Sequence, residues 1–195
     1  MSAQPETPAA RELAALGVSL RTEPRPDDLD TVRVMVAASG FFYRHEVEIA
    51  VELVRERLAR GAEATGYYFV FAERAAAERS AESASRERAT VPAARPIAYT
   101  CYGPIGCTLG SFDLYWIVVD NAERGRGLGR LLLRDTEARI AQAGGRRVYV
   151  ETSGRAQYEP TRRFYEHCGY VREAVLREFY GPGDDKIVYV KPLTE

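Results

Sequence analysis

The sequence has few cysteines, no long apolar run and no excess of charge of one sign. Its three cysteines, Cys101, Cys107 and Cys168, are an odd number and form neither a disulfide framework nor a paired C-x-x-C site. This pattern favours a reducing compartment, so we expect a cytoplasmic protein. No stretch approaches the roughly 18 consecutive apolar residues of a membrane-spanning helix. Residues 1–10 have neither the basic start nor the apolar run of a signal peptide, and we expect no membrane association.

The charges are balanced and scattered along the chain. There are 27 lysines and arginines against 28 aspartates and glutamates, which gives a formal net charge of −1. Such a chain has no overall field that attracts nucleic acid, so we expect no nucleic-acid partner. The two histidines, His45 and His167, do not form an H-E-x-x-H pair, and the cysteines lack the spacing of zinc ligands. We therefore expect no metal site.

The most informative stretch is residues 111–130. Its first half, 111–119, is rich in aromatic and β-branched residues, which are typical of a buried strand. In the second half, three glycines alternate mostly with arginines. The residues that follow at intervals of four share one face of a helix: Leu128, Leu132, Thr136 and Ile140. The predicted order is strand, glycine-rich turn and helix.

This order creates a binding site for an anion. The first N–H groups of a helix lack partners within the helix and lie at the positive end of its dipole. Glycines let phosphate groups approach the bare backbone, and Arg126 and Arg130 can add charge-assisted hydrogen bonds. A diphosphate is the ligand that fits best.

Two common nucleotide-binding motifs do not fit the spacing. The Rossmann fingerprint G-x-G-x-x-G lacks its third glycine when read from Gly125 or Gly127, and too little chain follows for a doubly wound sheet. Glu151 ends the next expected strand, where a Rossmann fold has the acidic residue that binds the ribose of the dinucleotide. A dinucleotide-binding oxidoreductase therefore stays open as an alternative. The P-loop needs Lys and then Ser or Thr after its last glycine, where this sequence has Arg130-Leu131.

Two motifs together resemble the GNAT superfamily of N-acetyltransferases. The run Arg124-Gly125-Arg126-Gly127-Leu128-Gly129 matches the [Gln/Arg]-x-x-Gly-x-[Gly/Ala] loop that binds the pyrophosphate of acyl-CoA in this family. Downstream, Phe164-Tyr165-Glu166-His167-Cys168-Gly169-Tyr170 resembles the second signature, Phe-Tyr-Glu-x-x-Gly-[Phe/Tyr]. The resemblance covers nearly the whole chain after residue 17 and implies acetyl-CoA as the co-substrate.

The resemblance also assigns roles to residues. It makes Tyr165 the general acid for the departing CoA sulfur, and a phenol suits this role because its unperturbed pKa of about 10 keeps it protonated at neutral pH. It places the pantetheine arm on the backbone of 117–119, where GNAT strands splay apart. The expected donor-binding residues are Ile117, Val118, Val119, Arg124, Gly125, Arg126, Gly127, Leu128, Gly129 and Arg130.

The base and the acceptor site leave alternatives open. Glu151 and Asp113 are the carboxylates expected to face the cleft, and either could bind the substrate ammonium or take its proton through water. We assign the catalytic role to Glu151, which ends a strand at the sheet edge where ligands collect. The expected substrate-binding residues are Phe42, Tyr43, Asp113, Tyr115 and Tyr158. This aromatic set favours an amine or aromatic acceptor, and a small-molecule amine and a protein amine both remain open.

Apolar periodicity and the positions of glycine and proline predict the order β-α-α-β-β-β-α-β-α-β-β. Strands are expected at 18–21, 66–73, 97–102, 111–119, 147–152, 171–178 and 186–191. Helices are expected after a cap at Asp27 or Asp28 and at 45–60, 127–143 and 160–168. This order is that of the GNAT fold, an α/β protein with a mixed twisted sheet of about six to seven strands and helices on both faces. We expect one domain at 17–195, a flexible tail at 1–16 that could hold a loose helix at 9–16, and a surface insertion at 74–94.

We predict an N-acetyltransferase that moves an acetyl group from acetyl-CoA to an amine by direct attack in a ternary complex. The alternative on the same fold is a protein that binds acyl-CoA as a sensor or partner without turnover. Exposed sheet edges at the last two strands are compatible with a homodimer.

Overall fold

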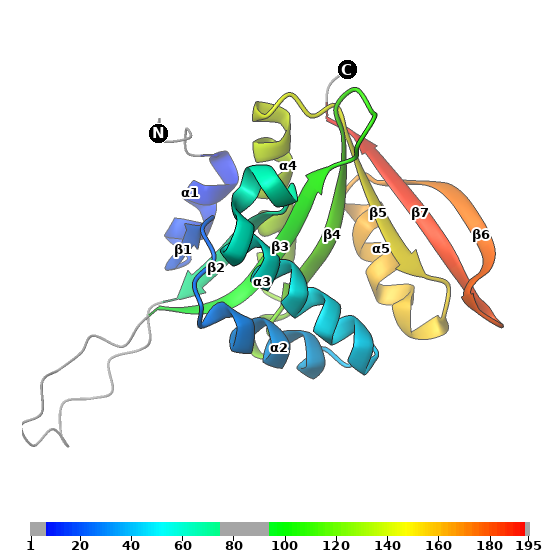
Figure 1. Ribbon diagram of the computed structural model, residues 1–195, viewed down its shortest axis with the longest axis horizontal. Helices are drawn as coiled ribbons and strands as arrows, with labels where there is room; N and C mark the ends of the chain where they lie inside the picture. The colour runs from blue at the N-terminus through cyan, green and yellow to red at the C-terminus, as the bar shows by residue number, and fades with distance from the viewer. Residues whose placement is uncertain (1–6, 75–93, 194–195) are drawn as a thin grey trace, which may run out of the picture.

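In the part of the chain that the structure describes, residues 7–74 and 94–193, seven strands form one mixed sheet with helices on both faces (Figure 1). The protein is described from a computed structural model. The elements in chain order are α1 (Pro8–Ala15), β1 (Val18–Arg21), α2 (Asp28–Ala38), α3 (Arg44–Thr65), β2 (Tyr68–Arg74), β3 (Arg95–Pro104), β4 (Ser111–Val119), the 3-10 turn η1 (Asn121–Glu123), α4 (Leu128–Gln142), β5 (Arg147–Ser153), the 3-10 turn η2 (Ala156–Tyr158), α5 (Glu159–His167), β6 (Val171–Gly181) and β7 (Asp184–Pro192). Apart from α1 and the two short turns, this is the predicted order, and the predicted fold class is confirmed.

The sheet has the strand order β1-β2-β3-β4-β5-β7-β6. All neighbouring strands are antiparallel except β4 and β5. These two run parallel because helix α4 carries the chain back between them, as a parallel connection requires. The last hairpin places β7 beside β5 and leaves β6 at the edge.

Two apolar layers hold the helices against the sheet. One layer lies between the sheet and α1, α4 and α5, and the other between the sheet and α2 and α3 (Figure 1). The predicted apolar face of α4 is buried in the first layer, with exposed fractions of 4% or less at Leu128, Leu132, Thr136 and Ile140. Because these side chains pack against the sheet, they hold α4 in place and determine where its first turn lies relative to the strands.

The flexible tail predicted for residues 1–16 differs from the structure. Residues 8–15 form helix α1, which is capped by the Thr7 side chain and buries Leu13 completely. The Thr7 hydroxyl also donates to the carboxylate of Asp135 on α4. A helix is thus present where a loose one was considered at 9–16, but it is docked on α4 rather than part of a flexible tail, because Leu13 and Thr7 bind it there. Residues 1–6, and all of the predicted insertion beyond Arg74 and before residue 94, lie outside the described residues.

Helix α3 runs past its predicted end at Gly61. Gly61 has φ +80° and ψ 171°, so the helix is broken there, and helical turns resume as far as Thr65. Gly66 then ends the element in the left-handed region, where glycine is favoured. At the other end, the Glu46 carboxylate accepts a hydrogen bond from the Tyr43 backbone N–H (2.6 Å), which fixes the first turn of α3.

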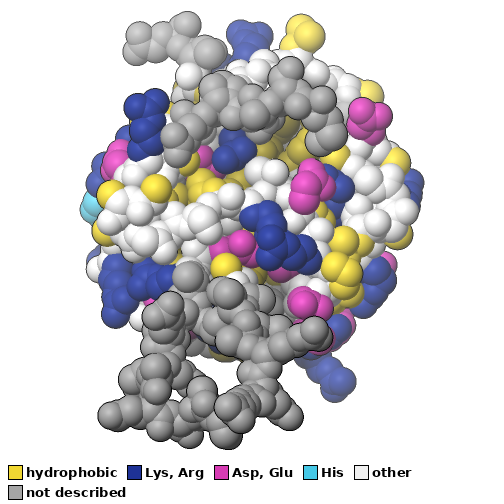
Figure 2. All heavy atoms as spheres, turned by 90° about the vertical axis from the view of Figure 1, so that its left-hand side faces the viewer, with side chains coloured by type: hydrophobic (Ala, Val, Ile, Leu, Met, Phe, Trp, Pro, Cys, Tyr) yellow, Lys and Arg dark blue, Asp and Glu magenta, His cyan; other side chains and the backbone are white. Residues whose placement is uncertain are grey.

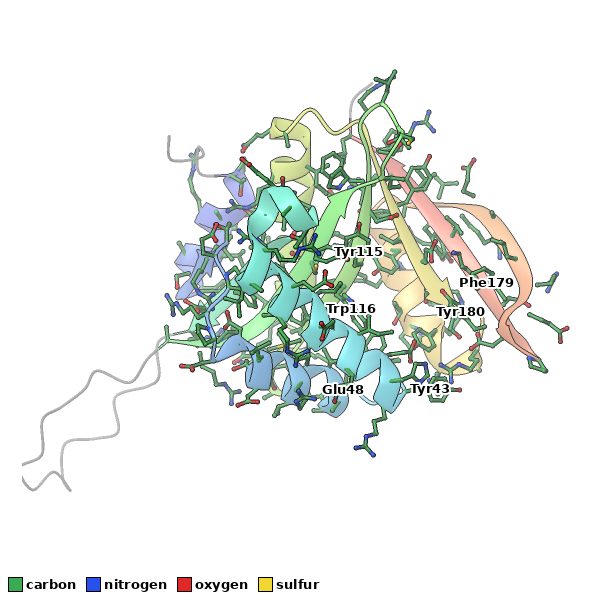
Figure 3. All side chains as sticks on the ribbon, viewed as in Figure 1. Tyr43, Glu48, Tyr115, Trp116, Phe179 and Tyr180 are labelled. Atoms are coloured by element: carbon green, nitrogen blue, oxygen red, sulfur yellow. The ribbon has the colours of Figure 1, made fainter. Side chains whose placement is uncertain are left out.

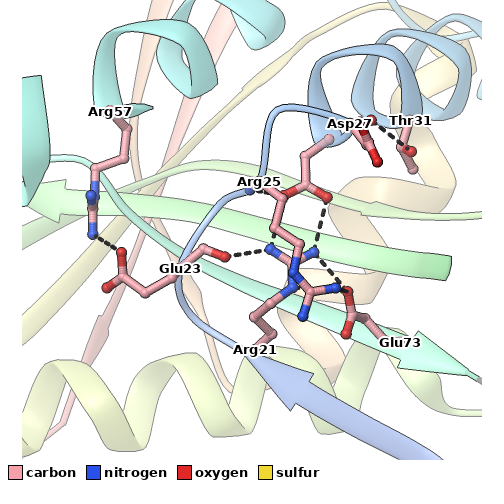
Figure 4. A network of polar contacts seen from close by, with 8 residues as sticks. Arg21, Glu23, Arg25, Asp27, Thr31, Arg57 and Glu73 are labelled. Carbon is pink, nitrogen blue, oxygen red and sulfur yellow. Dashed lines mark hydrogen bonds and ion pairs between the residues drawn. The ribbon is translucent and has the colours of Figure 1, made fainter. Parts of the chain in front are cut away.

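A nearly buried arginine joins β1 to α2 and β2 (Figure 4). Arg21 donates to both carboxylate oxygens of Asp28 (2.8 and 2.9 Å) and to Glu73 (2.7 Å). Its side chain is only 11% exposed, so the charge depends on these partners. Arg25 adds a longer contact to Glu73 (3.5 Å). This network fixes the start of α2.

Viewed from the side that carries β1, the described surface shows side chains of both charge signs interspersed with apolar ones (Figure 2). This agrees with the scattered charges of the sequence. Among the helices of residues 7–74 and 94–193, none is long and apolar enough to cross a membrane.

Candidate functional site

The sheet opens between β4 and β5. The two strands pair only over residues 111–113 of β4 and 147–149 of β5. Beyond this point β4 continues to Val119 beside β3, and β5 continues to Ser153 beside β7. The splay that the resemblance implied is therefore present in the structure.

A β-bulge in β4 lies at the start of the opening. Cys101 of β3 is opposite Trp116, and Tyr102 is opposite Leu114, so Tyr115 has no partner. A bulge bends its strand and increases the local twist. Past the bulge, one backbone edge of β4 faces the gap, with no strand of the described chain paired to it.

A cavity of about 510 Å³ fills this gap, and we call it the β4/β5 cleft. Its walls come from the loop after α2, from β4, from the glycine-rich turn and the start of α4, and from the ends of β5 and α5. The lining residues are Ser39, Phe41, Phe42, Leu114, Tyr115, Trp116, Ile117, Val118, Val119, Glu123, Arg124, Gly125, Gly127, Leu128, Gly129, Arg130, Glu151, Thr152, Tyr158, Pro160, Thr161, Phe164 and Tyr165.

Helix α4 begins at the floor of the cleft without a side-chain cap. Its N-cap residue is Gly127, in the left-handed region with φ +77°, and no side chain in the described part of the chain caps the helix. The N–H groups of residues 128–130 therefore have no partner inside the helix. Gly125 has the same φ, and a Cβ at either glycine would stand in open space. The sequence predicted an anion site at this helix start, and no side chain of residues 7–74 and 94–193 accepts a hydrogen bond from these N–H groups.

Two of the three predicted arginines line the cleft. Arg130 is exposed and forms no ion pair with any described residue. Arg124 reaches back to the carbonyl oxygen of Val119 (3.4 Å), and its guanidinium lies 5.5 Å from the Phe41 ring centre. Arg126 does not line the cleft; it pairs with Glu123 (3.2 Å), and its side chain is 62% exposed.

Tyr165 enters the cleft from α5. The residue is 6% exposed, and its ring packs against Tyr170 (5.5 Å between ring centres) and Tyr189 (6.2 Å). Burial raises the pKa of the Tyr165 phenol above its ordinary value of 10, and the nearby Cys168 adds to the rise. The hydroxyl therefore stays protonated at neutral pH and is available as a donor.

The two candidate carboxylates are in different positions. Glu151 lines the cleft, and the Lys186 ammonium binds one of its oxygens at 2.6 Å. Asp113 does not line the cleft. Burial raises the pKa of the Asp113 carboxyl, Glu151 raises it further, and Lys186 opposes the rise. The structure thus brings one of the two carboxylates to the cleft, together with a lysine that the sequence did not single out.

Three of the four predicted aromatic residues line the cleft, namely Phe42, Tyr115 and Tyr158. Tyr43 does not. Its ring lies under the Arg155 guanidinium (4.6 Å), and its hydroxyl accepts a hydrogen bond from Arg155 (2.5 Å). Figure 3 shows Tyr43 at the first turn of α3, away from Tyr115 in the middle of the sheet.

Sequence reasoning missed several lining residues. Trp116 lines the cleft beside Tyr115 and packs against Phe42 (4.6 Å between ring centres). Alternation along a regular strand would put these neighbours on opposite faces, but the bulge brings both to the cleft. Thr152 and Phe164 also line the cleft. Each is next in sequence to a predicted site residue, Glu151 or Tyr165, and this adjacency was the only sequence feature that pointed to them. Within residues 7–74 and 94–193, no group of three or more His, Cys, Asp or Glu is placed to hold a metal ion.

A family model of the acetyltransferase (GNAT) domain matches residues 87–172 of the chain. The crystal structure of a putative acetyltransferase of the GNAT family from Desulfovibrio desulfuricans is 41% identical in sequence. The match covers 91% of this chain and 99% of that one, with a TM-score of 0.77. No curated protein matches the chain.

More distant structures have the same architecture. An aminoglycoside 6'-N-acetyltransferase complexed with coenzyme A is 17% identical, with a TM-score of 0.64 over 91% of this chain and 97% of that one. The ribosomal-protein-S18-alanine N-acetyltransferase from Escherichia coli is also 17% identical, with a TM-score of 0.61 over 91% and 95%. At this identity the similarity shows the fold alone.

Proposed function

Because the chain belongs to the GNAT family of acetyltransferases, we propose that it transfers an acetyl group from acetyl-CoA to an amine acceptor within a ternary complex. The observation that carries this proposal is the uncapped start of α4 at Gly127, which shares one cleft with the unpaired edge of β4 and with Tyr165. A donor with a diphosphate, an amide-rich arm and a reactive thioester needs these three features in one cavity.

The diphosphate of acetyl-CoA would bind the backbone N–H groups of residues 125–130, with Arg124 and Arg130 supplying positive charge. The amide-rich pantetheine arm would pair with the free edge of β4 at 117–119, as an added strand does. Support comes from the distant aminoglycoside acetyltransferase, which was crystallised with coenzyme A on the same fold. Arg126 would contribute to the local potential rather than contact the ligand, because it lies outside the cleft lining.

The chemistry is the attack of a neutral amine on the thioester carbonyl. The C–N bond forms, the C–S bond breaks, and the sulfur leaves as a thiolate that takes the proton of the Tyr165 hydroxyl. Solvent then returns a proton to Tyr165. An unpaired backbone N–H of β4 at residues 117–119 is the group that would polarise the carbonyl oxygen.

The amine must lose a proton before or during attack, and Glu151 is the carboxylate that we assign to this step, acting through water. It lines the cleft, whereas Asp113 does not. Lys186 binds one oxygen of Glu151 and leaves the second free to meet the acceptor. Phe42, Tyr115 and Tyr158 would surround the acceptor, which is a small-molecule or protein amine. The three free cysteines, Cys101, Cys107 and Cys168, support a reducing, cytoplasmic location.

The test is release of free CoA thiol from acetyl-CoA in the presence of a panel of amines, with product mass measured for each. We expect thiol release that depends on both the protein and an amine, and an acetylated product. Binding of acetyl-CoA without turnover of any amine would instead support a sensor or partner that holds acyl-CoA. Absence of both binding and turnover would overturn the proposal.

A further inference from the structure

The β4/β5 cleft is lined from both faces of the sheet, and the two linings differ. On the face covered by α4 and α5, the apolar residues Leu128, Phe164 and Tyr165 lie beside the glycine-rich turn. On the face covered by α2 and α3, the lining is aromatic, with Phe42 and Trp116 packed against the apolar layer under those helices. The donor is assigned to the first face, so the second face is available to the acceptor.

The β-bulge in β4 builds this aromatic lining. Leu114 packs in the layer under α4 and α5, whereas Trp116 packs against the layer under α2 and α3. Residues two apart on a regular strand share one face, so the extra residue of the bulge is what turns Trp116 to the other side. Tyr115, the extra residue, meets Tyr67 of the same layer edge-on (5.8 Å between ring centres). Tyr115 and Trp116 therefore both belong to the central strand of the sheet at its opening (Figure 3).

The loop between α2 and α3 adds further rings. The Phe42 ring centre lies 4.6 Å from that of Trp116, and the Phe41 ring centre lies 5.5 Å from that of Tyr158. The carbonyl oxygen of Phe41 accepts hydrogen bonds from the Tyr158 hydroxyl (2.8 Å) and the Gln157 side chain (3.3 Å), which join the loop to η2. We call this part of the cleft the acceptor pocket; it is lined by Phe41, Phe42, Tyr115, Trp116, Tyr158 and Glu151.

The acceptor pocket has one charged side chain. Of the residues that line the whole cleft, all in the described part of the chain, four are charged: Glu123, Arg124, Arg130 and Glu151. The first three lie at or next to the glycine-rich turn, so Glu151 alone belongs to the acceptor pocket. One of its oxygens already binds the Lys186 ammonium at 2.6 Å. The other oxygen has room for a single amine.

Two cations adjoin the acceptor pocket, and both are paired. Lys186 binds Glu151, and Arg155, whose guanidinium lies 5.3 Å from the Tyr158 ring centre, binds Asp184 (3.1 Å). Neither cation lines the cleft. A carboxylate on the acceptor would therefore lack a partner and would face Glu151, and a second ammonium would find no second carboxylate. Burial of an unpaired charge is costly, so polyamines and free amino acids do not fit.

We propose that the acceptor is a primary amine that carries one positive charge on an aromatic or bulky apolar body, and that Trp116 selects this body. The inference takes the amine acceptor from the function proposed above and adds its chemical class. The amine would lie at the free oxygen of Glu151, with its body against Trp116 and Phe42. Aromatic rings that stack or meet edge-on gain energy beyond the area that they bury, which favours an aromatic body over a linear aliphatic one.

The test uses Trp116 as its own reporter, because it is the only tryptophan of the chain. Tryptophan emission of the full chain is followed during titration with 2-phenylethylamine, with and without saturating CoA, and we expect a saturable change. Free phenylalanine adds a carboxylate to that molecule, phenylalaninamide has a neutral amide at the same place, and spermidine has several ammonium groups. Phenylalaninamide should bind, whereas phenylalanine and spermidine should bind at least about tenfold more weakly than 2-phenylethylamine.

An emission that does not respond to 2-phenylethylamine would overturn the proposal, as would phenylalanine or spermidine that binds less than tenfold more weakly. Phenylalaninamide that binds as weakly as phenylalanine would also overturn it, because bulk rather than charge would then be excluded. A tripeptide amide that begins with phenylalanine separates two sources of this chemistry. If it binds as tightly as phenylalaninamide, the acceptor is a peptide N-terminus, and if its binding is lost, the acceptor is a free amine.

Variants test the role of Trp116 by calorimetric titration. Trp116→Leu should weaken 2-phenylethylamine binding by about tenfold and leave CoA affinity unchanged, and Trp116→Phe should stay within about threefold of wild type. Tyr68→Leu, at a 38% exposed aromatic residue of β2 outside the cleft lining, should change neither affinity. Wild-type amine affinity in Trp116→Leu would remove the selective role. If CoA binds and the amines are not distinguished, this inference fails alone; if CoA does not bind, the proposed reaction fails, and the emission still reports the amines.

Discussion

Asp113 on β4 lies opposite Tyr149 on β5, and this is the last residue pair that joins the two strands. Past it, each strand is held only by its other neighbour, β3 for β4 and β7 for β5. The cleft is therefore opened by the divergence of two strands of the sheet. The uncapped start of α4 and Tyr165 both line this gap.

Gly127→Asp should abolish CoA binding, because the new carboxylate stands at the site assigned to the diphosphate. Gly144→Asp is the matched control. Gly144 lies just past the opposite end of α4 and has φ +83°, also with open space around a Cβ. An aspartate is favoured at the positive end of a helix and disfavoured at the negative end, so Gly144→Asp should be the less stable variant by about 0.5–1 kcal/mol. Calorimetric titration with CoA should show that Gly127→Asp no longer binds CoA while Gly144→Asp still does. Thermal unfolding should show that Gly127→Asp is nevertheless the more stable of the two variants. If both variants bind CoA equally, the assignment of the loop is wrong.

Arg130→Gln should weaken CoA binding by about tenfold, because one charge-assisted hydrogen bond to phosphate is lost. The effect should shrink as salt is added, since Arg130 is exposed and its charge is screened. Arg126→Gln removes the same charge at a residue outside the cleft lining, and we expect less than about a threefold loss. If the loss of CoA affinity in Arg126→Gln is as large as that in Arg130→Gln, the ligand binds on the outer side of the turn and the assigned position is wrong.

Tyr165→Phe should lower kcat by about 100-fold or more and leave the affinity for acetyl-CoA unchanged, because only the proton donor is removed. Tyr170→Phe is the control, since Tyr170 is equally buried beside Tyr165 but does not line the cleft. Steady-state kinetics on both variants separates loss of the donor from loss of packing. Wild-type kcat in Tyr165→Phe, or equal losses in both, would remove the catalytic role.

Asp113→Asn should stabilise the protein at neutral pH and have little effect in acid. The pKa of Asp113 is raised in the folded state, chiefly by burial. A raised pKa means that stability from this group is present below its unfolded-state pKa and is lost as pH rises through the folded-state pKa. The neutral amide escapes that loss, so Tm should rise above wild type near pH 7 and converge with it as pH falls toward 4. Asp30→Asn, at an exposed position in the first turn of α2, controls for removal of one charge and should not raise Tm. A Tm difference at Asp113 that does not depend on pH would contradict the account.

Much of the fold could be predicted from local signals. Apolar residues at intervals of four marked α4, and their burial is complete or nearly so. Glycines marked the breaks, and Gly61 does break α3 although the helix resumes after it. The docking of α1 was not predicted, because Leu13 and Thr7 pack against α4, which is far away in the chain. No window of neighbouring residues contains that information.

The residues of the candidate site also divide into those with a local sequence signal and those placed by contacts between distant segments. The glycine-rich turn and Tyr165, which both line the cleft, could be found from sequence because each belongs to a short local motif. Arg126 was placed in the site by its position in the motif, but the turn directs it to Glu123 instead. The pairing of Glu151 with Lys186 depends on the register of β5 against β7, where Glu151 is opposite Val188. Such contacts between strands could be identified only from the assembled sheet.

The most direct test of the central claim is thermal unfolding of the wild type and of Gly127→Asp with saturating acetyl-CoA, CoA or NADH. A ligand at about 100 times its Kd adds roughly 2.7 kcal/mol, which corresponds to a Tm rise of a few degrees for a domain of this size. We expect that rise for wild type with both CoA forms, no rise with NADH, and no rise for Gly127→Asp with any of them. Wild type that shows no rise with either CoA form, or a rise with NADH alone, would contradict the account.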